Sequence, residues 1–548
     1  MEFFTVEVKK LELVVHHDTR NVIAFSSVKD LFRKLGLNEQ NFDPSLSKNL
    51  YLFYPTDMVV KSNFYQCNLS LTEKIPLEQR IRYRTKNVLD SVYAKIIDYI
   101  NKNIDGEKLS VYVVCNSYLD EFSQRFFEMA QKFGGWEVSC KIQHNYSLNS
   151  DKNQNNDENL YNKLSTLKSN GKSDFDKGLY DDLINISLEY LNAGDALTAK
   201  NICNFVKNFY SDSDLWNTLS ISEQMLRNPI MSEYYLDLIL NNNNIEKYKN
   251  GSRYSKAMLY ARVHSKELQS IEKSESLLNQ AYNEITSSDE YLNNVPNAIF
   301  SALFNRNGYA LILFRNNKIE EAKNLMIDCI AQIDNISIID GEEKLELYRS
   351  VLVYNLAQCY ERLGDYNNAI ISLNKLLDKD KLMDTYYLDL VRVYGYLNDI
   401  DSAIFSCRQT TLINPYSHQN WATLAYWQLQ KTLYLDSAFN YYYAYKLCLD
   451  PKKSLMYLND ALYSKILSKE QDCCPDLEAV LKNFVTNKEL FGFDESEVVK
   501  SFSLLAETEL CKGNQKQALD YLSLALVKFP NNNILKQNYE FLSSLYFE

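Results

Sequence analysis

Glycine and proline are scarce in this chain of 548 residues, which contains only 14 and 9 of them. Glycine supplies the positive φ angles of tight turns, and proline presets φ in loops. A chain this poor in both residues holds few tight turns, which argues against a β-sandwich, a β-propeller or a long β-barrel. No two glycines are spaced G-x-G and no G-x-x-x-x-G-K occurs. The dinucleotide-binding fingerprint and the phosphate-binding loop are therefore absent.

Paired cysteines and long apolar runs are also missing. The 11 cysteines are scattered singly, apart from Cys473-Cys474, and no C-x-x-C occurs. This usage is typical of reduced thiols in a cytoplasmic protein, not of a disulfide framework or a zinc site. No apolar run approaches the ~18 residues of a spanning helix, and the start (MEFFTVEVKK) resembles a strand rather than a signal peptide. We expect a cytoplasmic protein with no membrane span, no metal and no cofactor.

The charge is distributed unevenly along the chain. Residues 1–145 carry 19 Lys+Arg and 18 Asp+Glu, and the remainder carries 40 and 53, a net charge of −13. An arm this acidic repels a phosphate backbone, so we expect no nucleic acid among its partners. Electrostatics favours basic peptides or basic protein surfaces instead. The charge says nothing about the oligomeric state.

The first 145 residues show the pattern of a small α/β domain. Residues 4–15 alternate apolar and polar side chains, as a half-buried strand does. Further strands are predicted over residues 49–60, 109–115 and 136–143, and helices over residues 76–100 and 118–133. This head resembles no family that we recognise.

The next segment, residues 146–176, is polar and rich in Asn and Ser. Such a composition buries too little apolar surface to order a chain. We predict a flexible polar linker here.

A ladder of alanines then reveals a repeat. Ala369, Ala403 and Ala438 are 34 and 35 residues apart. The unit around Ala369 also has Leu356-Ala357, Tyr360 and Gly364, and related units contain Ala199, Ala322 and Ala518. Cys407 and Asn398 depart from the pattern, and residues 241–300 and 452–500 fit it poorly.

These residues resemble the tetratricopeptide repeat (TPR), whose helix–turn–helix unit is 34 residues long. The resemblance implies a mostly α fold. Residues 177–548 would form a TPR-like α-solenoid, a superhelix of helix–turn–helix repeats with a C-terminal capping helix. The small α/β domain of residues 1–145 precedes it.

The resemblance also implies a concave binding face lined by the first helix of each unit. Tyrosine and arginine suit binding hot spots, because they offer large contact areas with few rotamers to lose. The family's groove positions correspond here to Phe304, Asn307, Tyr354, Gln358, Arg362, Arg392, Tyr396 and Tyr426. Each of them has a plain alternative as a packing or solvent-facing residue. The Lys/Asn clamp that holds acidic tails is not seen at these positions.

Two residues of the head are the only candidates for catalysis. Cys115 ends a predicted strand and His144 follows the last one, so they could form a nucleophile–base pair. The alternative is a buried structural cysteine and a surface histidine, and we assign no catalytic residue. His16 and His17 are adjacent on a predicted strand, point to opposite faces and cannot share a metal.

Two functions remain. The first is a non-enzymatic scaffold or adaptor that binds a peptide or partner protein in its concave groove. The alternative is an enzyme or enzyme subunit whose α/β head acts on a peptide or protein substrate recruited by the repeat arm.

Overall fold

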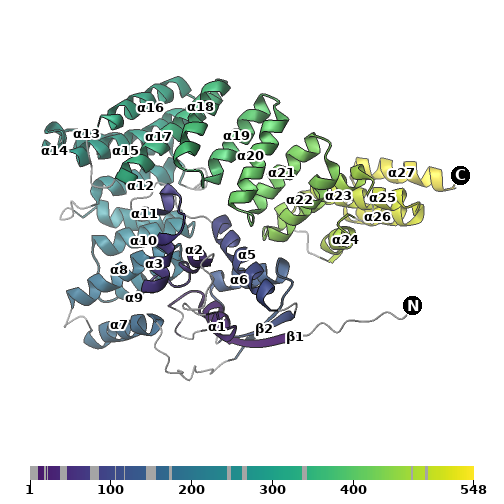
Figure 1. Cartoon of the computed structure of the whole chain (residues 1–548), viewed down its shortest axis with the longest axis horizontal. Helices are drawn as coiled ribbons and strands as arrows, with labels where there is room; N and C mark the ends of the chain where they lie inside the picture. The colour runs from purple at the N-terminus through teal and green to yellow at the C-terminus, as the bar shows by residue number, and fades with distance from the viewer. Residues whose placement is uncertain are drawn as a thin grey trace. The chain divides into compact units, whose positions relative to one another are not determined.

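The structure is a computed structural model of the chain. It describes residues 10–17, 20, 22–37, 46–74, 86–104, 107–115, 118–143, 156–171, 176–242, 248–261, 268–335, 342–470, 473–487 and 492–547. Three strands are interspersed with helices up to Ile142, and helices alone make up the rest of the described chain, which confirms the predicted mostly α fold (Figure 1).

The chain divides into two compact units. The first comprises Met1–Val92, Tyr99–Phe127 and Trp136–Tyr386, and the second comprises Tyr93–Asp98, Glu128–Gly135 and Tyr387–Glu548. The sheet and the first repeats thus belong to one unit. The boundaries predicted at residues 145 and 177 stay predictions.

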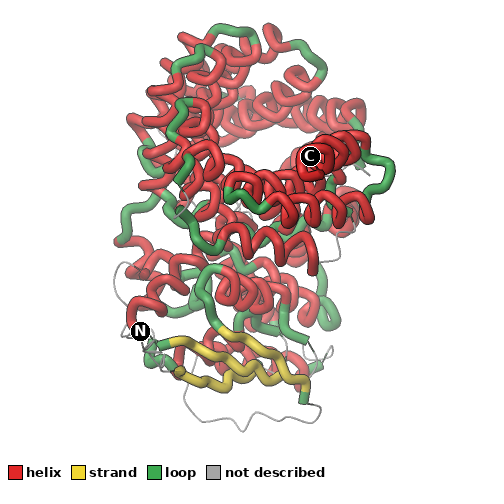
Figure 2. Tube along the Cα trace, turned by 90° about the vertical axis from the view of Figure 1, so that its right-hand side faces the viewer, coloured by secondary structure: helices red, strands yellow, loops and turns green. Residues whose placement is uncertain are grey.

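Three parallel strands lie side by side in the order β1-β2-β3 (Figure 2). They are β1 (Lys10–His16), β2 (Lys108–Cys115) and β3 (Glu137–Ile142), close to three of the four predicted strands. Alternate side chains such as Val15 and Val113 are buried, whereas Val14 and Tyr112 are 48% and 41% exposed. One face of the sheet is therefore packed against helices, and the other is open at these positions.

Helices and buried aromatic rings complete the head. Phe53 packs edge-on against Phe32 and Phe126, with ring centroids 5.2 and 6.4 Å apart. The head helices are α1 (Ser26–Lys34), α2 (Ser47–Leu50), α3 (Met58–Gln66), α4 (Leu71–Lys74), α5 (Lys86–Asn103) and α6 (Glu121–Lys132). The helices predicted over residues 76–100 and 118–133 correspond to α5 and α6, and residues 75–85 lie outside the described residues.

The strand predicted over residues 49–60 is wrong. That segment holds the end of α2, a turn and the start of α3. Asp57 accepts hydrogen bonds from the backbone N–H groups of Val59 and Val60, both 2.9 Å long, and so begins α3 as its N-cap. Leu50–Phe53 are buried in succession rather than alternately, because the turn itself lies in the core.

Helix α7 (Asn156–Asn170) lies within the segment predicted to be a flexible linker. Its Leu160, Leu164 and Leu167 recur at helical spacing and are buried in one cluster with Tyr180 and Leu183. The sequence prediction missed this helix because its apolar stripe is narrow and surrounded by polar residues.

Antiparallel helix pairs make up the rest of the first unit, and consecutive helices pack on one another. The pairs are α8 (Lys177–Ala193) with α9 (Ala196–Val206), α10 (Ser213–Met225) with α11 (Pro229–Leu240), α12 (Lys249–Ala261) with α13 (Ile271–Thr286), α15 (Pro296–Arg315) with α16 (Ile319–Asp334), and α17 (Glu342–Arg362) with α18 (Tyr366–Lys379). The short α14 (Asp289–Leu292) precedes α15.

The second unit continues the same pattern. Its helices are α19 (Asp384–Tyr396, which begins in the first unit), α20 (Ile400–Ile413), α21 (His418–Gln430), α22 (Tyr434–Leu447), α23 (Pro451–Ser468), α24 (Leu477–Asn487), α25 (Glu495–Cys511), α26 (Gln515–Lys528) and α27 (Asn533–Phe547). Ala369, Ala403 and Ala438 are all completely buried, which confirms the alanine ladder. Helix α27 is the last helix of the described chain, and its role as a capping helix stays a prediction.

Hydrogen bonds join the head to the first repeat inside the first unit. The backbone N–H of Ala24 donates to Thr198 Oγ1 over 2.8 Å, and Asn201 Nδ2 donates to the Val22 carbonyl over 3.0 Å. Ile23 lies in the same hydrophobic cluster as Tyr180 of α8. The sheet and the first helix pair therefore share a core.

The turns inside three consecutive repeats use a left-handed residue at intervals of 34 positions. Gly364, Asn398 and Thr432 have φ angles of 78°, 56° and 61°. The residue after each one donates its N–H to the carbonyl five positions earlier, as in a Schellman motif. Glycine adopts this conformation without strain, asparagine adopts it at a small cost, and a β-branched residue is the most strained there.

Substitutions of the three left-handed turn residues should change the stability of the protein in a fixed order. We expect Thr432→Gly to stabilise its repeat by about 1 kcal/mol, Asn398→Gly to stabilise it by less, and Gly364→Ala to destabilise by about 1 kcal/mol. Thermal unfolding followed by circular dichroism measures all three. A lower melting temperature for Thr432→Gly than for the wild type would contradict the assigned strain.

A buried aspartate begins the second helix of the first pair. Asp195 is 1% exposed and accepts hydrogen bonds from the backbone N–H and the hydroxyl of Thr198, 2.9 and 2.6 Å long. Burial raises the pKa of Asp195 to about 7, although the bonds from Thr198 lower it. Asp399 makes the same bonds with Ser402 at an exposed turn, and these bonds lower its pKa.

Asp195 should make the first unit less stable as the pH rises. Its folded-state pKa lies above its unfolded value, so its contribution is fully present below about pH 4 and is lost as the pH rises through about 7. We expect Asp195→Asn, which keeps an N-cap, to flatten the decline in stability between pH 5 and 7 by up to about 1.4 kcal/mol per pH unit. Denaturant unfolding measured at several pH values tests this.

Asp399→Asn is the matched control. Its pKa is lowered, so its contribution is present above the unfolded pKa and is lost as the pH falls. A decline between pH 5 and 7 as steep in Asp195→Asn as in the wild type would disprove the role assigned to Asp195.

Candidate functional site

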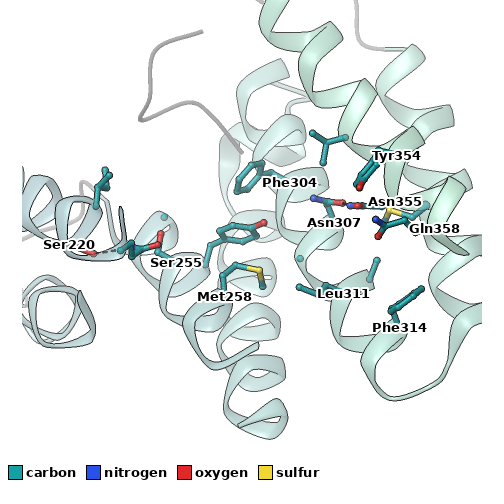
Figure 3. Close-up of a pocket in the computed structure, with 18 of the residues that line it drawn as sticks. Ser220, Ser255, Met258, Phe304, Asn307, Leu311, Phe314, Tyr354, Asn355 and Gln358 are labelled. Carbon is teal, nitrogen blue, oxygen red and sulfur yellow. Dashed lines mark hydrogen bonds between the residues drawn. The ribbon is translucent and has the colours of Figure 1, made fainter. Parts of the chain in front are cut away.

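Four successive first helices enclose a cavity in the first unit. Helices α10, α12, α15 and α17 supply nearly all of its lining, and the cavity has a volume of about 460 Å³ (Figure 3). First helices alternate with second helices along the chain, so the cavity lies on the face that the first helices form. It is the place where the resemblance implied a binding groove.

Amide side chains form the polar part of the lining. Asn355 Nδ2 on α17 donates to Asn307 Oδ1 on α15 over 2.6 Å, which fixes both amides. Gln358 lies one turn further along α17 and also faces the cavity (Figure 3). These groups both donate and accept hydrogen bonds, as the main chain of a peptide does.

Aromatic and sulfur-containing side chains form the apolar part. The rings of Tyr254 and Phe304 lie 4.4 Å apart between centroids, and Phe304 stacks on the buried Tyr348 at 5.5 Å. A Cβ at Gly308 would lie 2.7 Å from the Tyr254 ring and 3.1 Å from Met258. The lack of a side chain at Gly308 therefore lets α12 and α15 approach closely and sets the shape of the cavity.

None of the described residues that line the cavity is charged. Burial raises the pKa of the Cys359 thiol in the lining to about 11, so this thiol is protonated at neutral pH. Burial also raises the pKa of Tyr348 behind the aromatic wall. The cavity thus offers hydrogen bonds and apolar surface at neutral pH.

The structure brings together four of the predicted groove residues. Phe304, Asn307, Tyr354 and Gln358 all line the cavity. Arg362, the last residue of α17, is exposed and lies outside the lining. Whether any of them binds a partner stays a prediction.

The other three predicted groove residues belong to the second unit. Arg392 Nη1 lies 2.9 Å from Asp389 Oδ1 on the same helix. Tyr396 and Tyr426 are 58% and 47% exposed. They do not contribute to the cavity.

The candidate catalytic pair finds no support. Cys115 is buried at the end of β2 with its Sγ 3.4 Å from that of Cys140, and burial together with the bond to Cys140 raises its pKa to about 11. A catalytic cysteine that attacks a substrate from solvent needs an accessible thiol with a lowered pKa, and Cys115 has neither. His144 lies outside the described residues.

Sequence reasoning missed several lining residues. Tyr254 and Met258 lie on α12, in the stretch 241–300 that matches the repeat poorly. Asn355 is next to the predicted Tyr354, and its amide was visible in the sequence but not assigned to the groove. Ser220 and Gln224 of α10 complete the lining on the other side.

The described residues contain neither a metal-binding cluster nor a membrane-spanning helix. No group of three or more His, Cys, Asp or Glu within them is arranged to hold a metal ion. No helix within them combines the length and the apolar character needed to cross a bilayer.

Several solved structures of IFIT1 are similar to this chain. It is similar to solved structures described as a human IFIT1 dimer with PPP-AAAA (16% identity, 65% of this chain and 86% of that chain covered, TM-score 0.34) and an IFIT1 monomeric mutant with m7Gppp-AAAA (14% identity, 87% and 94% covered, TM-score 0.41). No curated protein matches the chain.

These findings correct one prediction. The expectation that nucleic acid is excluded as a partner is wrong, because the matched structures hold PPP-AAAA and m7Gppp-AAAA. That expectation rested on the summed charge of residues 146–548. The net charge of residues 146–548 describes the average electrostatic field of that segment. It does not determine which ligand a single pocket binds.

One segment matches a family model. Residues 352–381, which include the end of α17 and all of α18, match the model of the tetratricopeptide repeat. The helix pairs before and after this segment repeat its buried alanine and its turn. The chain thus contains a tetratricopeptide-repeat region, which lies within the longer series of helix pairs described above.

Proposed function

We propose that this protein is an interaction scaffold without catalysis of its own. Its cavity between α10, α12, α15 and α17 binds a peptide or a segment of a partner protein. The observation that carries this proposal is the cavity itself, which contains four residues placed in a groove by the repeat register, Phe304, Asn307, Tyr354 and Gln358.

The size and chemistry of the cavity support a peptide segment. Its volume of about 460 Å³ lies within the range of roughly 300–1,000 Å³ common for ligand sites. The amides of Asn355 and Gln358 suit main-chain groups, while Tyr254 and Phe304 offer surface for an apolar side chain. The uncharged lining favours an uncharged stretch of the segment at this point.

The walls of the cavity are preorganised. A hydrogen bond fixes the side-chain amides of Asn307 and Asn355. The ring of Phe304 packs against the rings of Tyr254 and Tyr348. A partner therefore binds without the cost of ordering these side chains.

We propose that Arg362, Arg392, Tyr396 and Tyr426, which lie outside the cavity, make further contacts with a partner.

The alternative of an enzymatic head has less support. Burial and the bond to Cys140 raise the pKa of Cys115, which leaves its thiol protonated. All 11 cysteines are free thiols, which supports our proposal that the protein works in the cytoplasm.

Photo-crosslinking tests the proposed site in the full chain. With p-benzoylphenylalanine in place of Tyr354, we expect irradiation in the native host to give an adduct with a protein, whose crosslinked segment mass spectrometry identifies. The same photoreactive residue at Ile327, which is 41% exposed on α16 and outside the cavity, is the control. We then expect Asn355→Leu or Gln358→Leu to weaken binding of the synthetic segment by about tenfold, ~1.4 kcal/mol, in calorimetry.

Two outcomes would overturn this assignment. Equal yields of the same adduct at positions 354 and 327 would show that the cavity is not the site. An adduct with RNA at position 354 in place of protein would assign the cavity to a different class of partner.

A pair of glycine substitutions separates binding from folding. A Cβ at Gly308 would meet the Tyr254 ring at 2.7 Å, and a Cβ at Gly395 would meet the Trp427 ring at the same distance, away from the cavity. We expect Gly308→Ala and Gly395→Ala to reduce stability similarly, by about 1–2 kcal/mol. Only Gly308→Ala should also weaken binding of the crosslinked segment, because Tyr254 and Met258, which line the cavity, must shift to admit the new Cβ.

A further inference from the structure

Two cysteines face each other across the edge of the sheet. Cys115 of β2 is paired in register with Ile142 of β3, and Val113 is paired with Cys140. Residues two apart on a strand point to the same face, so Cys115 and Cys140 are diagonal neighbours on one face. Their sulfur atoms lie 3.4 Å apart.

The two thiols differ in exposure. Cys115 is completely buried, whereas Cys140 is exposed. A disulfide requires the sulfurs to approach to about 2.05 Å, so a movement of little more than 1 Å closes the present gap of 3.4 Å. A reagent in solvent meets Cys140 first, with Cys115 directly behind it.

We propose that Cys140 and Cys115 form a modification site for low-molecular-weight disulfides, such as oxidised glutathione. The Cys140 thiolate attacks one sulfur of the reagent, which forms a mixed disulfide and releases one thiol. The Cys115 thiolate then attacks the Cys140 sulfur, which forms the Cys115–Cys140 disulfide and releases the second thiol. One molecule of reagent is reduced to two thiols, and the two cysteines are oxidised to one cystine.

The electrostatics of the pair supports this order of attack. Burial and the hydrogen bond to Cys140 raise the pKa of Cys115 to about 11. Once Cys140 is part of a mixed disulfide it is no longer a thiolate, and the contribution of its charge to that shift disappears. Cys115 is thus unreactive toward a reagent in solvent but is placed to resolve an adduct on Cys140.

The Cys115–Cys140 disulfide would link the edge strand β3 covalently to β2. β3 pairs only with β2 among the described strands, and most of its side chains are exposed. A disulfide between the two strands restricts the separation of β3 from the sheet. The head therefore responds to the thiol–disulfide balance, a property independent of the proposed partner binding.

Other cysteines of the chain provide internal controls. Cys511 on α25 is exposed and has no hydrogen bond to another thiol among the described residues, so a mixed disulfide formed there should persist. Cys473 and Cys474 are adjacent but only 5% and 3% exposed, which limits access of the reagent.

The test treats the full chain with oxidised glutathione at pH 8, blocks free thiols with iodoacetamide and maps peptides by mass spectrometry over time. We expect a transient glutathione adduct on Cys140, then a Cys115–Cys140 crosslink, and a lasting adduct on Cys511. Hydrogen exchange at the amides of β3 should slow when the crosslink forms. Dithiothreitol should reverse both changes.

Two variants assign the steps. Cys115→Ala should take up glutathione at Cys140 at the wild-type rate but keep the adduct. Cys140→Ser should form no crosslink and leave Cys115 unmodified. A lasting adduct on Cys140 in the wild type, or a crosslink from Cys140 to any cysteine other than Cys115, would overturn the proposal, and the wild-type time course decides this even if a variant fails to fold.

Discussion

The close crossing of the two helices within each pair is the constraint on which the helical part of the protein depends. Ala369, Ala403 and Ala438 are completely buried where second helices pack on first helices. A larger side chain at such a position would separate the helices and open voids on both sides. Because consecutive pairs stack on one another, the requirement recurs with every unit, and the sequence repeats at the same interval.

This recurrence explains why the repeats could be predicted from the sequence. The alanine ladder requires only a small residue at a fixed interval, and Gly364 marks a left-handed turn directly. Asn398, which departs from the pattern, still adopts the left-handed conformation, and asparagine tolerates it well. Thr432 could not have been predicted there, since its branched Cβ disfavours that conformation.

The head and the segment after it were harder to predict, for different physical reasons. The strand predicted over residues 49–60 failed because a run of buried residues is also produced by a turn enclosed in a core. Helix α7 was missed because composition averages over a segment, whereas three leucines on one face are enough to bury a helix. On β3, the exposure of Cys140 depends on how far the covering helices reach, which the strand's own sequence does not contain.

Only some of the residues that line the candidate site could be predicted from the sequence. The repeat register indicated Phe304 and Tyr354, because groove positions are fixed relative to the buried alanines. It did not indicate Tyr254 and Met258, whose helix lies in a stretch with a poor match, or Gly308, whose contribution is a missing side chain. The shape of a hollow depends on the distance between helices, which is a property of tertiary packing.

The core shared by the head and the first helix pair gives the α/β head a second structural role. A stack of repeats ends in an apolar face that must be covered, and solenoids usually cover it with a polar terminal helix. Here Ile23 and α7 contribute to that core beside Tyr180 and Leu183. The head and α7 thus cap the N-terminal end of the repeat array, where they cover the apolar face of the first helix pair. A shortened chain that starts at residue 177 would expose this face to water and would be prone to self-association, so the sheet and the first helix pairs are best treated as one folding unit.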